Sequence, residues 1–127
     1  MGLCLYRGGI GQATARAFAR NGCSIAVHHS SERSKAKADA LVSELLGLAP
    51  GVRAAAFEAD LSTYDNARKL CDRVVEVLGH PDILFSNHGV TGPRIGPNGD
   101  VQDVSAESFE EIWRTNTGTG YVVRIRS

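Results

Sequence analysis

The fold of this chain is decided by the stretch Arg7-Gly-Gly-Ile-Gly-Gln-Ala-Thr-Ala-Arg-Ala-Phe18. The glycines Gly8, Gly9 and Gly11 stand directly before small and apolar residues at helical spacing. Glycine adopts backbone angles that a Cβ forbids, and it lets another group approach the main chain closely. A helix that begins near Ile10 would turn its free N–H groups and its positive dipole end toward this turn, which suits a phosphate group. The alternative is a flexible turn before an ordinary helix, because a glycine cluster alone is a weak signal.

The composition indicates one globular domain without a strong overall charge. The sequence has 127 residues, of which 43% are hydrophobic and 22% are charged, and its formal net charge is zero. Such a balance creates no field that attracts nucleic acid or an anionic membrane, and no apolar run approaches the roughly 20 residues that span a bilayer. Neither the cysteines nor the histidines show metal-ligand spacing, and the cysteines are interpreted as free thiols. We therefore expect a cytoplasmic protein with no metal, nucleic acid or membrane among its partners.

Strands and helices are predicted to alternate along the chain. The first helix is expected to place Ile10, Ala13, Ala17 and Phe18 on one face. Residues 28–33 are predicted to form a polar loop, and residues 87–104 a long one. Strands are predicted at 2–5 (a stub), 23–27, 52–57 and 82–86, and helices at 10–20, 34–46, around 67–78 and after Ser105. This order calls for a parallel sheet covered by helices on both faces, in one domain over residues 1–127.

Polar or glycine-containing segments follow all four predicted strands. The glycine cluster follows the first strand, residues 28–33 the second, Asp60-Leu61 the third and Asn87-His88-Gly89 the fourth. Ligands of open parallel sheets bind at the carboxyl ends of the strands, where the winding reverses. These four segments together favour a ligand site more strongly than the glycine cluster does alone.

Four motifs in order make the chain resemble the N-terminal half of a short-chain dehydrogenase/reductase, on the branch of the 3-oxoacyl-acyl-carrier-protein reductases. Gly9-Ile10-Gly11 is similar to the end of the family's Thr-Gly-x-x-x-Gly-Ile-Gly turn. Asp60-Leu61-Ser62 is similar to its Asp-(Leu/Val)-(Ser/Thr) segment, and Ser86-Asn87-His88-Gly89 to its Asn-Asn-Ala-Gly motif. Asn116 is similar to the family's helix asparagine.

The resemblance implies a Rossmann-like, doubly wound sheet in three α/β/α layers that binds a nicotinamide dinucleotide. It also implies hydride transfer between that cofactor and a carbonyl or alcohol substrate, with the carboxylate of Asp60 on the adenine ring. Asn116 would help to hold a water molecule in a proton relay, and the helix that carries it usually contributes to a homo-oligomer interface. Taken singly, Asp60 could cap the next helix, Asn87 and Gly89 could form a turn, and Asn116 could be an ordinary helix residue. Phe109 and Trp113 are expected in the core.

The end of the second strand favours NADP over NAD. NAD-preferring enzymes of this fold carry an acid there, which bonds the ribose 2′-hydroxyl, and the family spacing puts His29 at this position. Ser30, Ser31 and Arg33 offer hydroxyl and guanidinium contacts to a 2′-phosphate. The candidate cofactor-binding residues are therefore Gly9, Ile10, Gly11, His29, Ser30, Arg33, Asp60, Leu61, Asn87 and Gly89, and the candidate catalytic residue is Asn116.

The sequence departs from the family pattern at both ends. Leu5 stands where the family has its first turn glycine. The family's catalytic Ser and Tyr-x-x-x-Lys pair follow the helix asparagine, yet none of Tyr6, Tyr64 and Tyr121 is followed by Lys four residues later. Because a tyrosine must move a proton to or from the substrate oxygen, we expect this chain alone to be inactive. We interpret it as a partial NAD(P)-binding domain truncated at both ends, poorly soluble, a weak binder of NADP, and of doubtful oligomeric state.

Two other functions are considered beside the oxidoreductase. The first is a non-catalytic module that binds a nucleotide or a partner, which the missing Tyr-x-x-x-Lys pair favours for this polypeptide. The second is an unrelated flavodoxin-like signalling domain. Such a domain would show acidic residues after its first strand, and residues 4–11 contain none.

Overall fold

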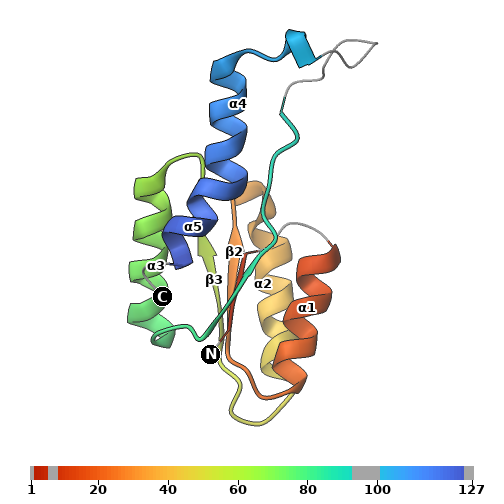
Figure 1. The fold of residues 1–127 in the computed structure, drawn as a ribbon. Coiled ribbons are helices and arrows are strands. Elements are labelled where there is room, and N and C mark those ends of the chain that lie inside the picture. The colour runs from red at the N-terminus through yellow and green to blue at the C-terminus, as the bar shows by residue number, and fades with distance from the viewer. Residues whose placement is uncertain (1, 6–8, 93–100, 125–127) are drawn as a thin grey trace.

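The computed structural model describes residues 2–5, 9–92 and 101–124, and it shows alternating strands and helices as predicted (Figure 1). The elements are β1 (Gly2–Leu5), α1 (Gly9–Arg20), β2 (Ile25–His29), α2 (Glu32–Leu46), β3 (Ala54–Glu58), α3 (Tyr64–Leu78), β4 (Ile83–Ser86), the 3-10 turn η1 (Val101–Asp103), α4 (Ala106–Trp113), the π-helix η2 (Arg114–Gly118) and α5 (Thr119–Arg124). Arg7 and Gly8, the first part of the glycine turn, lie outside the described residues.

The four strands form one parallel sheet in the order β3-β2-β1-β4. The strand β1 is a stub of four residues, as expected, yet it pairs with a neighbour on each side. Its last residue, Leu5, stands opposite His28 of β2 and Ser86 of β4. Leu5 therefore belongs to a strand, whereas the family comparison placed it at a turn. Because the pairing is parallel throughout, the carboxyl ends of all four strands meet at one edge.

Helices cover both faces of the sheet, which confirms the predicted α/β fold with three layers (Figure 1). On one face, α1 and α2 pack over Ile25 and Val27 of β2. On the other face, α3 and α5 pack over Ala26 of the same strand. Alternate residues of a strand point to opposite faces of the sheet. Since helices cover both faces, all five residues of β2 are buried. The next residue on the side of Ala26 is His28, whose ring reaches Ala59 after β3 and stands edge to face with His88 after β4.

The buried face of α1 differs from the predicted one. Gly11, Ala15 and Ala19 are buried, whereas Ile10 is 69% exposed and Ala13 and Ala17 are exposed as well. A spacing of four residues keeps side chains on one stripe of a helix. The buried stripe consists of small residues, which allow α1 to approach the sheet closely. The larger Ile10 lies off this stripe and faces solvent. The predicted end of this helix is confirmed, since Gly22 adopts a positive φ of 82°, as a helix C-cap glycine commonly does.

The second strand lies two residues later than predicted, and this corrects the interpretation of residues 28–33 as loop. His28 and His29 are the last residues of β2 and are 2% and 4% exposed. Their polarity suggested a loop, but each ring reaches a backbone carbonyl. The His28 Nε2 atom lies 2.8 Å from Ala59 O, and the His29 Nδ1 atom lies 3.1 Å from Ser31 O. Hydrogen bonds of this kind offset the cost of burying a polar side chain.

The expectation that Phe109 and Trp113 belong to the core is wrong. They are 57% and 51% exposed, and their rings stack on each other with centroids 6.4 Å apart. Figure 1 shows why: α4 rises beyond the edge of the sheet, where no strand lies beneath it. None of its residues, all of which the structure describes, is buried. Within the described segments, no helix combines the length and the apolar character that a bilayer span requires.

Candidate functional site

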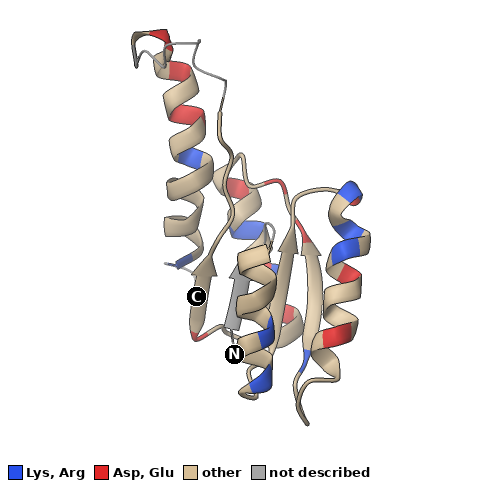
Figure 2. Ribbon diagram, turned by 90° about the vertical axis from the view of Figure 1, so that its right-hand side faces the viewer, with Lys and Arg blue, Asp and Glu red and all other residues tan. Residues whose placement is uncertain are grey.

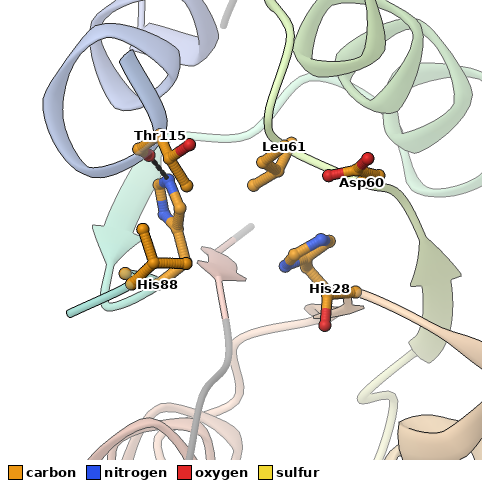
Figure 3. A pocket seen from close by; sticks show the side chains of 8 residues that line it. His28, Asp60, Leu61, His88 and Thr115 are labelled. Carbon is orange, nitrogen blue, oxygen red and sulfur yellow. Dashed lines mark hydrogen bonds between the residues drawn. The ribbon is translucent and has the colours of Figure 1, made fainter. Parts of the chain in front are cut away.

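A pocket of about 310 Å³ lies at the carboxyl edge of the sheet (Figure 3). The sequence predicted a site at the ends of all four strands. The ends of β2, β3 and β4 contribute to this pocket, together with the π-helix η2, which was not predicted. Of the predicted cofactor-binding residues, Ser30, Asp60, Leu61 and Gly89 come together here. Four residues to which the sequence assigned no role in binding complete the lining: His28, His88, Val90 and Thr115.

Asp60 is held in place by the residues that follow it. One carboxylate oxygen accepts from the Ser62 backbone N–H at 2.9 Å, and the other accepts from the Ser62 hydroxyl at 2.9 Å. The Asn66 amide donates to the Asp60 carbonyl at 2.8 Å. The N-cap of α3 is Thr63, whose hydroxyl accepts from the Asn66 backbone N–H. Asp60 is therefore not the helix cap, and its carboxylate is fixed at the pocket with lone pairs left to accept from a ligand.

The side chain of His28 forms the floor of the pocket below Asp60 and Leu61 (Figure 3). Because the Ala59 carbonyl can only accept, the Nε2 atom of His28 carries the proton and donates to it at 2.8 Å. The neutral ring then has a lone pair at Nδ1, and this buried atom has no hydrogen-bond partner among the residues that the structure describes. Burial is the main cause that lowers the pKa of His28 to about 4; the neighbouring His88 and His29 act in the same direction, and the hydrogen bond to Ala59 opposes them.

His88 connects the end of β4 to the helices opposite. Its Nε2 atom donates to the Thr115 carbonyl at 2.6 Å and lies 2.9 Å from the Thr119 hydroxyl (Figure 3). Burial lowers the pKa of His88 as well. The His28 and His88 rings stand edge to face, with centroids 6.5 Å apart. His88 stands where the family motif has Ala. In this chain, its side chain therefore adds a hydrogen bond between the segment after β4 and Thr115 of η2.

The side-chain amide of Asn116 forms two hydrogen bonds with the backbone of a single residue, Val90. The Oδ1 atom accepts from Val90 N–H at 2.7 Å, and the Nδ2 group donates to the Val90 carbonyl at 2.9 Å. A Cβ at Gly89 would lie 3.2 Å from Asn116 Oδ1, so a glycine there allows the close approach. Asn116 thus holds the segment that lines the pocket. Its predicted catalytic role stays a prediction.

The other predicted residues are not among those that line this pocket. Gly9, Ile10 and Gly11 form the first turn of α1. His29 is buried in β2, and its Nδ1 atom lies 3.8 Å from Glu58 Oε2. Arg33 is exposed in the first turn of α2, and Asn87 directly follows β4.

His28 was left out of the predicted site because the end of the second strand was predicted two residues too early. With β2 ending at Val27, His28 was assigned to a loop, whereas the parallel register sets it opposite Leu5 and Phe57. Continued alternation from Ala26 would have pointed its ring to the α3 face. Thr115 carried no such signal, because its place depends on the π-helical turn at residues 114–118.

The burial of His28 predicts a loss of stability in acid. The pKa of His28 is about 4 in the folded chain and near 6.5 in the unfolded chain. Below pH 6.5 the unfolded chain therefore takes up a proton that the folded chain does not bind, and the free energy of unfolding falls until the pH is near 4. Between pH 7 and pH 4.5, a pKa of 6.5 lowered to about 4 predicts a loss of roughly 2 kcal/mol, measurable by urea unfolding at these two pH values.

The variants His28→Gln and His80→Gln form a matched pair for this test. The glutamine at position 28 removes the titrating ring, so the pH dependence should become clearly shallower, while His88 still contributes in the same direction. His80 is exposed, and its replacement should leave the pH profile as it was. Equal slopes in all three proteins would show that the burial of His28 is wrongly described.

Removing the amide of Asn116 should destabilise the fold. Asn116→Ala eliminates two hydrogen bonds to Val90, and we expect the free energy of unfolding to fall by about 1–2 kcal/mol in urea titrations. Thr117→Ala, at the exposed neighbouring position, should change it by less than about 0.5 kcal/mol. Similar losses in both variants would argue against the role of Asn116 as the anchor of the segment at Val90.

The chain matches the protein-family model described as "Enoyl-(Acyl carrier protein) reductase" over residues 5–124. Versicolorin reductase 1 of Dothistroma septosporum is 33% identical over 117 residues, which cover 91% of this chain and 41% of that protein. This chain therefore spans less than half the length of that curated relative.

Two solved structures share the fold. A blue fluorescent protein from a metagenomic library, in complex with NADPH, is 29% identical with a TM-score of 0.79, over 98% of this chain and 49% of that one. A 3-oxoacyl-[acyl-carrier protein] reductase from Brucella melitensis is 26% identical with a TM-score of 0.80, over 98% of this chain and 47% of that one. Together with the matched family model, these likenesses show that the chain belongs to the short-chain dehydrogenase/reductase family of oxidoreductases.

Proposed function

We propose that this chain supplies the adenosine-binding half of an NADP(H)-dependent oxidoreductase of carbonyl or alcohol substrates. The observation that carries the proposal is the pocket at the carboxyl edge of the sheet, where Ser30, Asp60, Leu61 and Gly89 converge. Support also comes from the structure of the related blue fluorescent protein, which was solved in complex with NADPH. The cofactor, when bound, supplies or accepts the hydride, and this chain's residues bind and orient its adenosine part.

The lining of the pocket suits a purine ring. Leu61 and Val90 offer apolar contact to a flat base, and Gly89 adds no side chain that would obstruct it. Asp60 and His28 bring two hydrogen-bond acceptors to the same cavity, of which the His28 Nδ1 atom has no partner within the described part of the chain. A mostly apolar cleft with a few converging polar groups is the usual form of a small-molecule site.

The first turn of α1 suits the pyrophosphate. Gly9 and Gly11 lie at the start of a helix of 12 residues. Among the described residues, a Cβ at Gly9 would meet nothing within 4 Å, so there is space for a ligand beside this position. The first backbone N–H groups of a helix and its positive dipole end favour a phosphate there.

The preference for NADP rests on the region after β2. Ser30 lines the pocket, and Ser31 and Arg33 flank the start of α2. Figure 2 shows basic residues gathered at the end of α2 that lies beside the strand tips, and the sequence there contains Arg33, Lys35 and Lys37. A phosphate on the ribose would meet hydroxyl and cationic groups at this place. Two carboxylates at this place would oppose a 2′-phosphate: Glu58, whose Oε2 atom lies 3.8 Å from His29 Nδ1, and Glu32 in the first turn of α2.

The substrate assignment and the lack of turnover are further parts of the proposal. A 3-oxoacyl or similar carbonyl substrate is supported by the name of the Brucella melitensis relative. The sequence contains no Tyr followed by Lys four residues later, so we propose that these 127 residues bind cofactor without transferring hydride. A non-catalytic nucleotide-binding or partner-binding role is thus the second candidate. Among the residues that the structure describes, Cys23 and Cys71 form no disulfide, which supports a place in a reducing compartment such as the cytosol.

The adenosine half alone should account for the binding energy of this chain. By isothermal titration, 2′-phospho-ADP-ribose and NADPH should bind with affinities that agree within about threefold, because the base, the ribose and the phosphates make the contacts. ADP-ribose, which lacks only the 2′-phosphate, should bind more weakly. Arg33→Ala should weaken the binding of 2′-phospho-ADP-ribose by about three- to tenfold, as expected for an exposed charge-assisted contact, and leave the binding of ADP-ribose unchanged.

Lys69→Ala is the control, because this exposed cation belongs to α3 and does not line the pocket. It should bind all three nucleotides as the unaltered chain does. Binding of NADPH with no binding of 2′-phospho-ADP-ribose would contradict the adenosine-half proposal. Tighter binding of ADP-ribose than of 2′-phospho-ADP-ribose would contradict the NADP preference.

A further inference from the structure

The His28 ring is the one side chain of the pocket with an unused, buried acceptor within the described part of the chain. The His28 side chain is 2% exposed, and it lines the cavity from the second-to-last position of β2. Its Nε2 atom is already occupied, because it donates to the Ala59 carbonyl at 2.8 Å. Its Nδ1 atom finds no donor in the described segments. A buried acceptor without a partner is uncommon in folded proteins and calls for an explanation.

The protonation state of the ring is fixed by this geometry. The Ala59 carbonyl has no proton to give, so the hydrogen of the neutral imidazole is at Nε2 and the lone pair is at Nδ1. Burial lowers the pKa of His28 to about 4, and the ring is therefore neutral at pH 7. His28 can accept a hydrogen bond at Nδ1, and it has no second proton to donate.

We propose that Nδ1 of His28 accepts a hydrogen bond from the exocyclic amine of adenine, which makes His28 a residue that selects the base of the cofactor. This inference rests on the proposed function, since it concerns the same dinucleotide. An amine carries two hydrogens, and two residues that line the pocket have an acceptor left to offer, His28 with its buried Nδ1 and Asp60 with its carboxylate. A ribose hydroxyl has only one hydrogen to give and would leave one of these acceptors unpaired.

The same geometry rejects a base with an oxo group at this position. In hypoxanthine, a carbonyl oxygen replaces the amine, so an acceptor would face the lone pair of Nδ1. The Nε2 proton of His28 is directed to Ala59, so the ring cannot reverse its role without losing that bond. Sites that hydrogen-bond a polar group discriminate strongly against analogues that leave their buried groups unpaired.

The test compares NADPH with its deaminated analogue, reduced nicotinamide hypoxanthine dinucleotide phosphate, by isothermal titration of the chain. The unaltered chain should bind the analogue at least about tenfold more weakly, because both acceptors of the pocket lose their donor. On binding NADPH, the ¹⁵N resonance of the His28 Nδ1 atom should move upfield, as it does when an unprotonated imidazole nitrogen accepts a hydrogen bond. The analogue should not produce this shift.

Two substitutions separate the two ends of the ring. His28→Gln keeps an amide that can donate to Ala59 and removes the acceptor at the Nδ1 position, so the discrimination should fall by about three- to tenfold. The rest of the discrimination against the deaminated analogue should remain, because Asp60 still accepts from the amine of adenine. His28→Asn places a carbonyl oxygen near the Nδ1 position and should retain most of the preference for adenine.

The outcomes distinguish this inference from the function on which it rests. If the unaltered chain binds neither NADPH nor the analogue, the proposed function fails and the inference fails with it. If NADPH binds and the Nδ1 resonance stays in place, or if the analogue binds equally well, the inference alone is overturned. The same holds if His28→Gln discriminates as well as the unaltered chain does.

Discussion

The parallel pairing of β1 with both of its neighbours is the constraint on which the rest of the structure depends. Only four residues, Gly2–Leu5, connect the half of the sheet made by β2 and β3 to β4. Because every pair is parallel, the strand ends must lie at one edge, and the covering helices leave that edge as the place where polar groups can gather. The pocket is a consequence of this arrangement.

Two sets of hydrogen bonds then shape the edge into a site. His88 donates to Thr115, and Asn116 exchanges two bonds with the backbone of Val90. Both sets connect the segment after β4 to the π-helix η2, so a widened helical turn and a strand exit hold each other in position. π-Helical turns are often found at functional sites, and here the turn brings Thr115 into the lining. The segment after β4 is thereby positioned before any ligand arrives.

The order of the elements and half of the pocket could be predicted from the sequence. Asp60, Leu61 and Gly89 were found because each follows an apolar strand whose end is marked by polar or turn-forming residues. His28 was missed because two consecutive histidines resemble a loop, and only the carbonyls that their rings contact explain their burial.

The helices show a similar limit. The face of α1 was misjudged because Gly11, Ala15 and Ala19 carry almost no hydrophobic signal, although close packing selects them. Phe109 and Trp113 have the hydrophobic character of a core, but α4 extends past the sheet that would cover them. In both cases the missing information is how far a helix lies from, or beyond, the strands. Such distances depend on the tertiary arrangement and leave no local pattern in the sequence.

The most direct measurement of the central claim is a map of backbone amide shifts in ¹H–¹⁵N spectra of the chain during titration with NADPH. If the carboxyl edge of the sheet holds the adenosine half of the cofactor, the amides of Ser30, Leu61, Gly89 and Val90 should shift together and saturate with one dissociation constant. Shifts confined to α4, around the exposed Phe109 and Trp113, or no shifts at saturating NADPH, would contradict this account.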